Sequence, residues 1–182
     1  MIKYVLCVCA KREVYMKYII KNKIISWGAG TTVKDEAGND LYFVKGSVFT
    51  FTKKKFVRDM AKNDLYIVRN KFLFFLLPKV YICDKDGNKL LMLKKKNAFG
   101  FKQNFEVVPM SDKAPNWSIM GDIIARNFSI VENGDPIGQV RKNFNLIKDS
   151  FWLETTDERA PLMIAFIIAI DNYYDKLQNE ER

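Results

Sequence analysis

Three stretches of the chain repeat nearly the same thirteen residues. They read VKDEAGNDLYFVK from Val33 to Lys45, VRDMAKNDLYIVR from Val57 to Arg69, and ICDKDGNKLLMLK from Ile82 to Lys94. In each copy a β-rich run ends at an Asp, an Asn follows four residues later, and a second run ends on a basic residue. A period of this kind indicates one supersecondary unit that is used repeatedly.

The residues between each Asp and Asn predict a tight turn. Gly and Asn tolerate a positive φ, so each unit is predicted to be an antiparallel hairpin. The predicted strands cover residues 31–34, 41–45, 56–58, 65–69, 81–83 and 90–94. Two further apolar runs, 46–51 and 71–77, are interpreted as returning strands of a meander.

A fourth, degenerate copy of the unit spans Phe128 to Lys142, where Asn133-Gly134 supplies the turn. Pro136 follows that turn and predicts either an edge strand or a bulge, because proline cannot donate to a ladder. The copies together predict about twelve short strands. Closing them into a barrel removes the unpaired sheet edges that favour aggregation.

The segment APLMIAFIIAI, from Ala160 to Ile170, has no polar face. A helix that is apolar all round must be buried on every side. Eleven residues are too few to cross a bilayer, which needs about twenty. The expected fold is therefore mainly β: a barrel of about twelve antiparallel strands that encloses a hydrophobic C-terminal α-helix, starting near Pro161.

A chain of 182 residues has the size of one domain, and we expect that domain to span residues 16–182. Residues 1–15 are interpreted as an N-terminal extension. The apolar run from Tyr4 to Ala10 is a poor signal peptide, since no small-residue cleavage site follows it. Lys11-Arg12-Glu13-Val14 can be encoded by a bacterial ribosome-binding sequence, which predicts that translation starts at Met16.

Composition argues against several classes of chemistry. The chain has no histidine, which excludes histidine-based acid–base catalysis and the usual zinc sites. The run from Asp84 to Asn88 begins like a calcium loop but lacks the terminal Glu. We therefore expect no catalytic residues, no metal and no cofactor. The three cysteines form no disulfide framework and suggest a reducing cytosol, and Cys83 is predicted to face outward or to be half-buried.

The net charge of +9 is unevenly distributed. Residues 16–110 carry 19 basic and 8 acidic residues, whereas residues 111–182 carry 8 basic and 12 acidic ones. Hairpin tips collect at the ends of a barrel, so the bases near them are candidates for a basic rim that binds anions. The alternative is that these bases only solvate the barrel. The candidates are Lys53, Lys54, Lys55, Arg58, Arg69, Lys71, Lys94, Lys95 and Lys96.

The stretch MKYIIKNKIISWG from Met16 to Gly28, the repeated VKDEAGNDLYFVKG element and the hydrophobic terminal helix together resemble the LURP-one-related family and its bacterial YxjI-like branch. This resemblance implies a tubby C-terminal-like fold, with twelve strands wrapped around a central hydrophobic helix. Relatives on that fold include the tubby proteins, which bind phosphoinositides, and the phospholipid scramblases. The phosphoinositide contacts of tubby do not map onto this sequence position by position.

Three functional hypotheses remain. The first is a non-enzymatic cytoplasmic barrel that binds an anionic ligand, such as phospholipid headgroups or a phosphoinositide, or lies on the inner face of the membrane. The second is single-stranded nucleic-acid binding through the same charges and exposed aromatic residues. The third is a structural or protein-interaction module with no small ligand. The sequence does not identify a protein partner or an oligomeric state.

Overall fold

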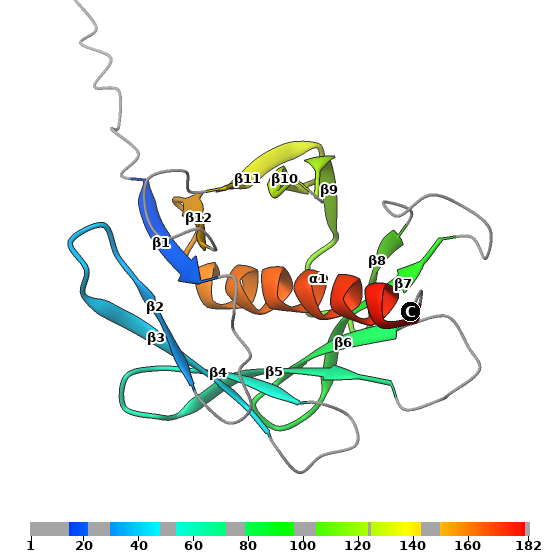
Figure 1. Ribbon diagram of the computed structural model, residues 1–182. Coiled ribbons are helices and arrows are strands. Elements are labelled where there is room, and N and C mark those ends of the chain that lie inside the picture. The colour runs from blue at the N-terminus through cyan, green and yellow to red at the C-terminus, as the bar shows by residue number, and fades with distance from the viewer. Residues whose placement is uncertain are drawn as a thin grey trace, which may run out of the picture.

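The computed structural model describes residues 15–21, 30–47, 54–71, 79–96, 105–123, 125–142 and 150–180. Within these ranges the chain forms a continuous series of strands followed by one helix (Figure 1). The elements are β1 (Met16–Lys21), β2 (Thr31–Lys34), β3 (Asp40–Gly46), β4 (Lys55–Arg58), β5 (Asp64–Asn70), β6 (Lys79–Asp84), β7 (Lys89–Lys95), β8 (Phe105–Pro109), β9 (Trp117–Asp122), β10 (Asn127–Glu132), β11 (Asp135–Lys142), β12 (Ser150–Thr155) and α1 (Ala160–Glu180).

The twelve strands form one antiparallel sheet that curls into a nearly closed barrel around α1 (Figure 1). The sheet order is β8-β7-β6-β5-β4-β3-β2-β1-β12-β11-β10-β9. Every ladder joins two consecutive strands, except that the first strand pairs with the last; β8 and β9 are consecutive in the chain but form the two edges of the sheet. The two edges, β8 and β9, lie beside each other without a hydrogen-bonded ladder among the described residues. The expected fold class, a twelve-stranded barrel enclosing a helix, is confirmed.

The three repeated hairpins have turns of the same structure. In each turn, hydrogen bonds between an Asp and an Asn hold the backbone in place. One carboxylate oxygen of the Asp accepts a hydrogen bond from the backbone N–H of the Asn at 2.8 Å. The other accepts one from the Asn side-chain amide at 2.8–2.9 Å. The pairs are Asp35 and Asn39, Asp59 and Asn63, and Asp84 and Asn88. The amide donors lower the pKa of each Asp carboxyl from its ordinary value.

The residue before each Asn has the left-handed conformation that closes the turn. Its φ is +88° at Gly38, +69° at Lys62 and +90° at Gly87. In the fourth hairpin Asn133 and Gly134 have φ values of +53° and +95°, as a two-residue hairpin turn requires. The register of β10 against β11 shifts opposite Pro136, so of the two alternatives for this proline the bulge is the one observed.

The helix forms the centre of the core. Its residues from Leu162 to Ile170 are all nearly inaccessible to solvent. Phe166 packs edge-on against Trp117 of β9, with ring centroids 5.5 Å apart. Just before the helix begins, Asp157 accepts a hydrogen bond from the backbone N–H of Arg159 at 2.7 Å, which fixes the residue that precedes the first turn.

Two ion pairs fix the direction of the helix within the barrel. Arg159, just before α1, binds Glu132 at the end of β10, with 2.6 Å between Nη2 and Oε2. Asp171, three turns later, binds Arg126 just before β10 at 2.6 Å. The helix therefore runs antiparallel to β10. It begins at the hairpin end of the barrel, where the repeated turns lie, and runs toward the opposite end.

Two predicted strands fall largely outside the described part of the chain. The runs 46–51 and 71–77 include residues 48–51 and 72–77, which the structure does not describe, and among the described residues β3 pairs directly with β4 and β5 with β6. The helix continues to Glu180, beyond the apolar segment that ends at Ile170. The expectation about the N-terminal extension falls on residues 1–14, which lie outside the described residues, and on Tyr15, which precedes β1.

Candidate anion-binding surface

The end of the barrel opposite the hairpin turns gathers basic side chains from the outer faces of neighbouring strands. We call it the basic end. There β3, β5 and β7 end, and β4 and β6 begin. Exposed or half-buried bases lie at or next to these strand ends, and no histidine accompanies them. The set is Lys45, Lys54, Arg69, Lys71, Lys79, Lys94 and Lys96.

The densest part of the basic end lies over β6 and β7. Lys79 and Lys94 are directly opposite each other in the antiparallel ladder. The backbone N–H of Lys71 donates to the carbonyl oxygen of Lys79 at 2.9 Å, which brings a third lysine close to this pair at the basic end. Lys94 also binds Glu106 of β8 at 2.7 Å. Two like charges directly opposite on a ladder are destabilising, and Glu106 supplies a counter-charge to Lys94.

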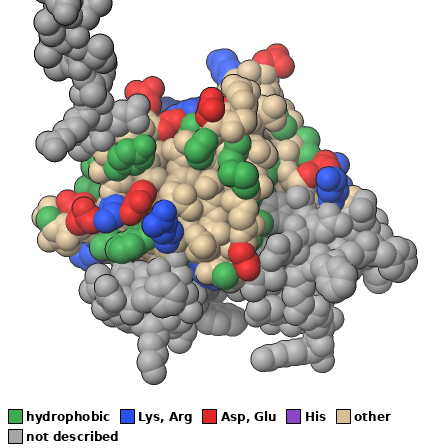
Figure 2. Space-filling model, turned by 90° about the horizontal axis from the view of Figure 1, so that it is seen from above, with side chains coloured by type: hydrophobic (Ala, Val, Ile, Leu, Met, Phe, Trp, Pro, Cys, Tyr) green, Lys and Arg blue, Asp and Glu red, His purple; other side chains and the backbone are tan. Residues whose placement is uncertain are grey.

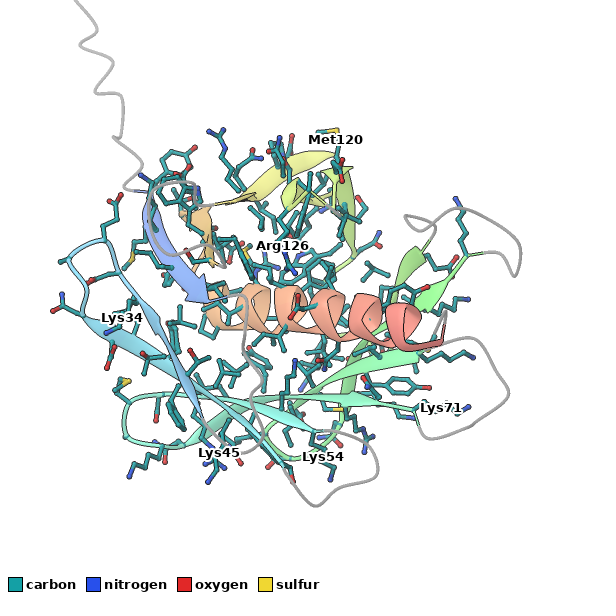
Figure 3. The ribbon with its side chains drawn as sticks, in the orientation of Figure 1. Lys34, Lys45, Lys54, Lys71, Met120 and Arg126 are labelled. Atoms are coloured by element: carbon teal, nitrogen blue, oxygen red, sulfur yellow. The ribbon has the colours of Figure 1, made fainter. Side chains whose placement is uncertain are left out.

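A second group of bases lies over β3, β4 and β5. The backbone N–H of Ser47 donates to the carbonyl oxygen of Lys54 at 2.8 Å, so β3 and the start of β4 are held together there. Figure 3 shows the side chains of Lys45 and Lys54 outside the barrel near the start of β4, and Lys71 beyond the end of β5. Arg69 lies opposite Tyr81 in the ladder between β5 and β6.

Some predicted bases are not part of the basic end. Arg58 lies at the hairpin end, where its guanidinium binds Asp64 at 2.5 Å and lies 5.3 Å from the ring of Phe56. Lys34 makes the equivalent pair with Asp40 in the first hairpin, also at 2.5 Å. Each of these ion pairs joins the two strands of one hairpin. Lys53 and the side chain of Lys95 lie outside the described part of the structure.

Lys55 faces the interior of the barrel instead of the rim. It alternates along β4 with Phe56 and shares the inner face with Val57, and only 3% of its surface is exposed. Its Cα partners are Gly46 on β3 and Val68 on β5. The run of three lysines from Lys53 to Lys55 is therefore divided by the pleat of the strand, since successive side chains point to opposite faces.

Sequence reasoning missed Lys45 and Lys79. Each stands alone in the sequence, so neither belongs to a run of basic residues that marks a candidate site. Lys45 could have been predicted from the repeat, because it occupies the same position as the candidates Arg69 and Lys94 in the other two copies. Lys79 had no such signal, because its place opposite Lys94 depends on the register of β6 against β7.

The opposite wall of the barrel differs in how its charged side chains are distributed. Figure 2 views the molecule over β9–β12, where uncharged and hydrophobic side chains occupy the middle of the face and most charged ones lie near its margins. Met120 on β9 is exposed on this wall. Because sheet order follows chain order, the charge asymmetry of the sequence becomes an asymmetry between the two walls of the barrel.

Cys83 lies on the outer side of β6, as the sequence predicted, yet it is fully buried. Its ladder partners are Ile67 and Lys89. Burial raises the pKa of the thiol from its ordinary value, and the nearby Arg69 guanidinium offsets only part of that effect. A buried thiol with a raised pKa is a poor nucleophile.

The described ranges contain no cluster of three or more metal-ligating residues. No helix in the same ranges combines the length and the apolar character that a bilayer crossing requires.

Comparisons with known proteins address the family and the fold. The family model described as LURP-one-related matches residues 16–171. The barrel is similar to the X-ray structure of a protein from Arabidopsis thaliana, with a TM-score of 0.59 and 15% sequence identity. That similarity covers 87% of this chain and 91% of the plant chain. A search of curated proteins found no match.

Proposed function

We propose that this chain, which belongs to the LURP-one-related family, is a non-enzymatic barrel protein that binds the headgroup phosphates of acidic phospholipids through its basic end. The observation that carries the proposal is the convergence of lysines from separate strands. Four of them lie close together where β5 and β7 end and β6 begins: Lys71, Lys79, Lys94 and Lys96. Lys79 is directly opposite Lys94.

The energetics of this cluster favour an anionic partner. Each base held near an anionic membrane surface contributes about 1 kcal/mol of attraction. Opposed lysines repel each other, and an anion that binds between them relieves the repulsion. Lys71 and Lys96 are exposed, so both ammonium groups are accessible to a headgroup. The proposal concerns binding alone and assigns no reaction to the protein.

The cytoplasmic leaflet is the proposed place of action. Its lipids give that surface a negative potential, which falls off within one Debye length. The protein therefore acts as a peripheral protein at the inner face of the membrane, held by charge and released by salt.

Vesicle flotation tests the proposal. The double variant Lys71→Ser/Lys96→Ser removes two exposed bases from the basic end. The matched control, Lys85→Ser/Lys113→Ser, removes two exposed bases from the hairpin end. We expect the wild type and the control to float with vesicles that contain phosphatidylserine and not with neutral vesicles. The first variant should bind about 30-fold more weakly, since two lysines contribute about 2 kcal/mol.

Competition separates the proposal from its two alternatives. Vesicle binding that survives an excess of single-stranded oligonucleotide supports the lipid assignment. Loss of vesicle binding to the oligonucleotide assigns the basic end to nucleic acid instead. Absence of binding to either polyanion at low salt, where screening is weakest, leaves a structural or protein-interaction module.

A further inference from the structure

The turn of the fourth hairpin differs from the three repeated turns in the bonding of its asparagine. In each repeated turn the side-chain amide of the Asn donates to an Asp carboxylate at 2.8–2.9 Å. Asn133 in the fourth turn has a φ of +53° and an exposed side chain. Among the described residues that side chain forms no hydrogen bond. Its carboxamide is therefore not held in place, unlike those of Asn39, Asn63 and Asn88.

The residue after the asparagine differs as well. In the repeated hairpins it carries a side chain and is the first residue of a strand; these residues are Asp40, Asp64 and Lys89. Asn133 is followed by Gly134, and no other glycine in the chain follows an asparagine. Gly134 is exposed, and a Cβ added to it would meet no atom within 4 Å beyond its chain neighbours. Its backbone N–H donates no hydrogen bond within the described ranges. An accessible nitrogen thus lies next to an unbound carboxamide.

The ladder next to this turn is irregular. The register of β10 against β11 shifts between Ile130 and Val131. Pro136, the partner of Val131, has no N–H to donate to the ladder. Between that proline and the turn only Glu132 and Asp135 pair with each other. A hairpin tip held by so few ladder bonds opens at a lower free energy than the core strands do.

We propose that Asn133 is a site of spontaneous deamidation, in which the chain is modified by its own backbone and by water. When the turn opens, the backbone nitrogen of Gly134 attacks Cγ of the Asn133 carboxamide. The new C–N bond closes a succinimide ring, and the C–N bond of the carboxamide breaks. The proton that the Gly134 nitrogen loses leaves with the amide group as ammonia. Because glycine has no side chain, it hinders this attack less than any other residue.

Water completes the reaction. It adds to either carbonyl carbon of the ring, and the bond from that carbon to the Gly134 nitrogen breaks or the main chain is restored accordingly. Cleavage at Cγ yields aspartate in an ordinary main chain. Cleavage at the main-chain carbonyl carbon yields isoaspartate, in which the main chain continues through the side chain of the former Asn133. The net reaction consumes water and releases ammonia, and nothing is oxidised or reduced.

Both products alter the hairpin that anchors the start of the helix. Each adds a carboxylate close to Glu132 and Asp135, and like charges at short range repel each other. Isoaspartate also adds a carbon atom to the main chain between these two paired residues, so their register is lost. Glu132 binds Arg159 just before α1, with 2.6 Å between Oε2 and Nη2. Deamidation therefore weakens the contact at the helix start in aged molecules. It does not depend on the proposed lipid binding.

Peptide mass spectrometry of the full chain, incubated folded in mildly alkaline buffer, tests the site. The peptide that contains Asn133 should gain the mass difference between –NH2 and –OH, and it should separate into aspartate and isoaspartate forms. The peptide that contains Asn63 is the internal control. Its amide is bound to the Asp59 carboxylate, so it should react at least about 10-fold more slowly. No gain at Asn133, or an equally fast gain at Asn63, overturns the proposal.

Thermal unfolding of fresh and incubated protein tests the link to the helix. The incubated, fully modified wild type should melt about 3 °C below the fresh protein. Asn133→Gln keeps a carboxamide that cannot close the succinimide ring, so its melting temperature should not change on incubation. Fresh Asn133→Asp carries the charge in an ordinary main chain and should show only part of the wild-type loss. A modified wild type that melts like the fresh protein, or an equal loss in incubated Asn133→Gln, contradicts the link between this turn and the helix start.

Discussion

Oδ1 of Asp171 lies 2.6 Å from Nη2 of Arg126, and this pair joins the central helix to the turn between β9 and β10. The carboxylate side chain is 5% exposed and the guanidinium side chain is 26% exposed. The guanidinium also lies 5.1 Å from the ring of Phe151. One cation therefore neutralises a buried carboxylate and packs on the core at the same time.

The first prediction concerns this pair. Replacing Arg126 with Gln leaves the Asp171 carboxylate buried without a cation, and we expect the free energy of unfolding to fall by about 2 kcal/mol. The double variant Arg126→Gln/Asp171→Asn should recover more than half of the loss. Urea denaturation measures both changes. Arg141→Gln, at an exposed position on β11, is the control and should change stability by less than about 0.5 kcal/mol. Equal effects of the two arginine substitutions contradict the role given to the pair.

The second prediction tests the central position of the helix. Phe166 is fully buried against Trp117, so a Phe166→Asp substitution places an unpaired charge in the core. We expect it to abolish cooperative unfolding in circular dichroism. Phe166→Leu keeps an apolar side chain and should cost about 1 kcal/mol. A Phe166→Asp variant that unfolds cooperatively at normal stability rules out a central helix.

The third prediction follows from the lowered pKa of the hairpin aspartates. The Asn63 amide lowers the pKa of Asp59, so the Asp59 carboxyl binds protons less readily in the folded chain than in the unfolded one. Its contribution to stability is present above about pH 4 and is lost as the pH falls through the lower folded pKa. Asn63→Ala should therefore be less stable than the wild type at pH 7, and the difference should shrink toward pH 2.

Urea denaturation at both pH values checks this expectation. Asn127→Ala, at an exposed asparagine outside the three repeated turns, serves as the matched control. Its effect should not depend on pH in the acid range. An Asn63→Ala effect of the same size at both pH values shows that the amide does not act through the carboxylate.

The fourth prediction concerns thiol chemistry. In a chain with Cys7→Ser and Cys9→Ser, Cys83 should react with a thiol reagent only as fast as the protein opens, because the thiol is buried and its pKa is raised. A chain with Ser118→Cys as its single cysteine places a thiol at an exposed position on β9 and should react at least 100-fold faster. Similar reaction rates for the two thiols contradict the burial of Cys83.

The hairpins could be predicted because their signal is local. An Asp and an Asn four residues apart satisfy each other's hydrogen bonds within one turn, so the spacing alone encodes the structure. The buried helix could be predicted equally well, because a helix with apolar residues on every side has no face that can be exposed to water. Both predictions required only neighbouring residues.

The basic end was less predictable. Which bases belong to it depends on the face of the strand to which each side chain points and on the register between neighbouring strands. Lys55 was expected at the rim, but the pleat of β4 turns it inward, and one residue decides between the two faces. Lys79 was missed because only the alignment of β6 with β7 brings it opposite Lys94. The burial of Asp171 depends on Arg126, 45 residues earlier in the chain, and no local pattern announces such a partner.

The pairing of β1 with β12 has a consequence for how the chain folds. Every other ladder in the sheet joins consecutive strands and can form soon after its own turn, whereas Met16 meets Thr155 across nearly the whole chain. Closing so long a loop has a large entropic cost before any contact compensates for it. We therefore expect the hairpins to form early, and the meeting of the first and last strands to set the rate at which the barrel is completed.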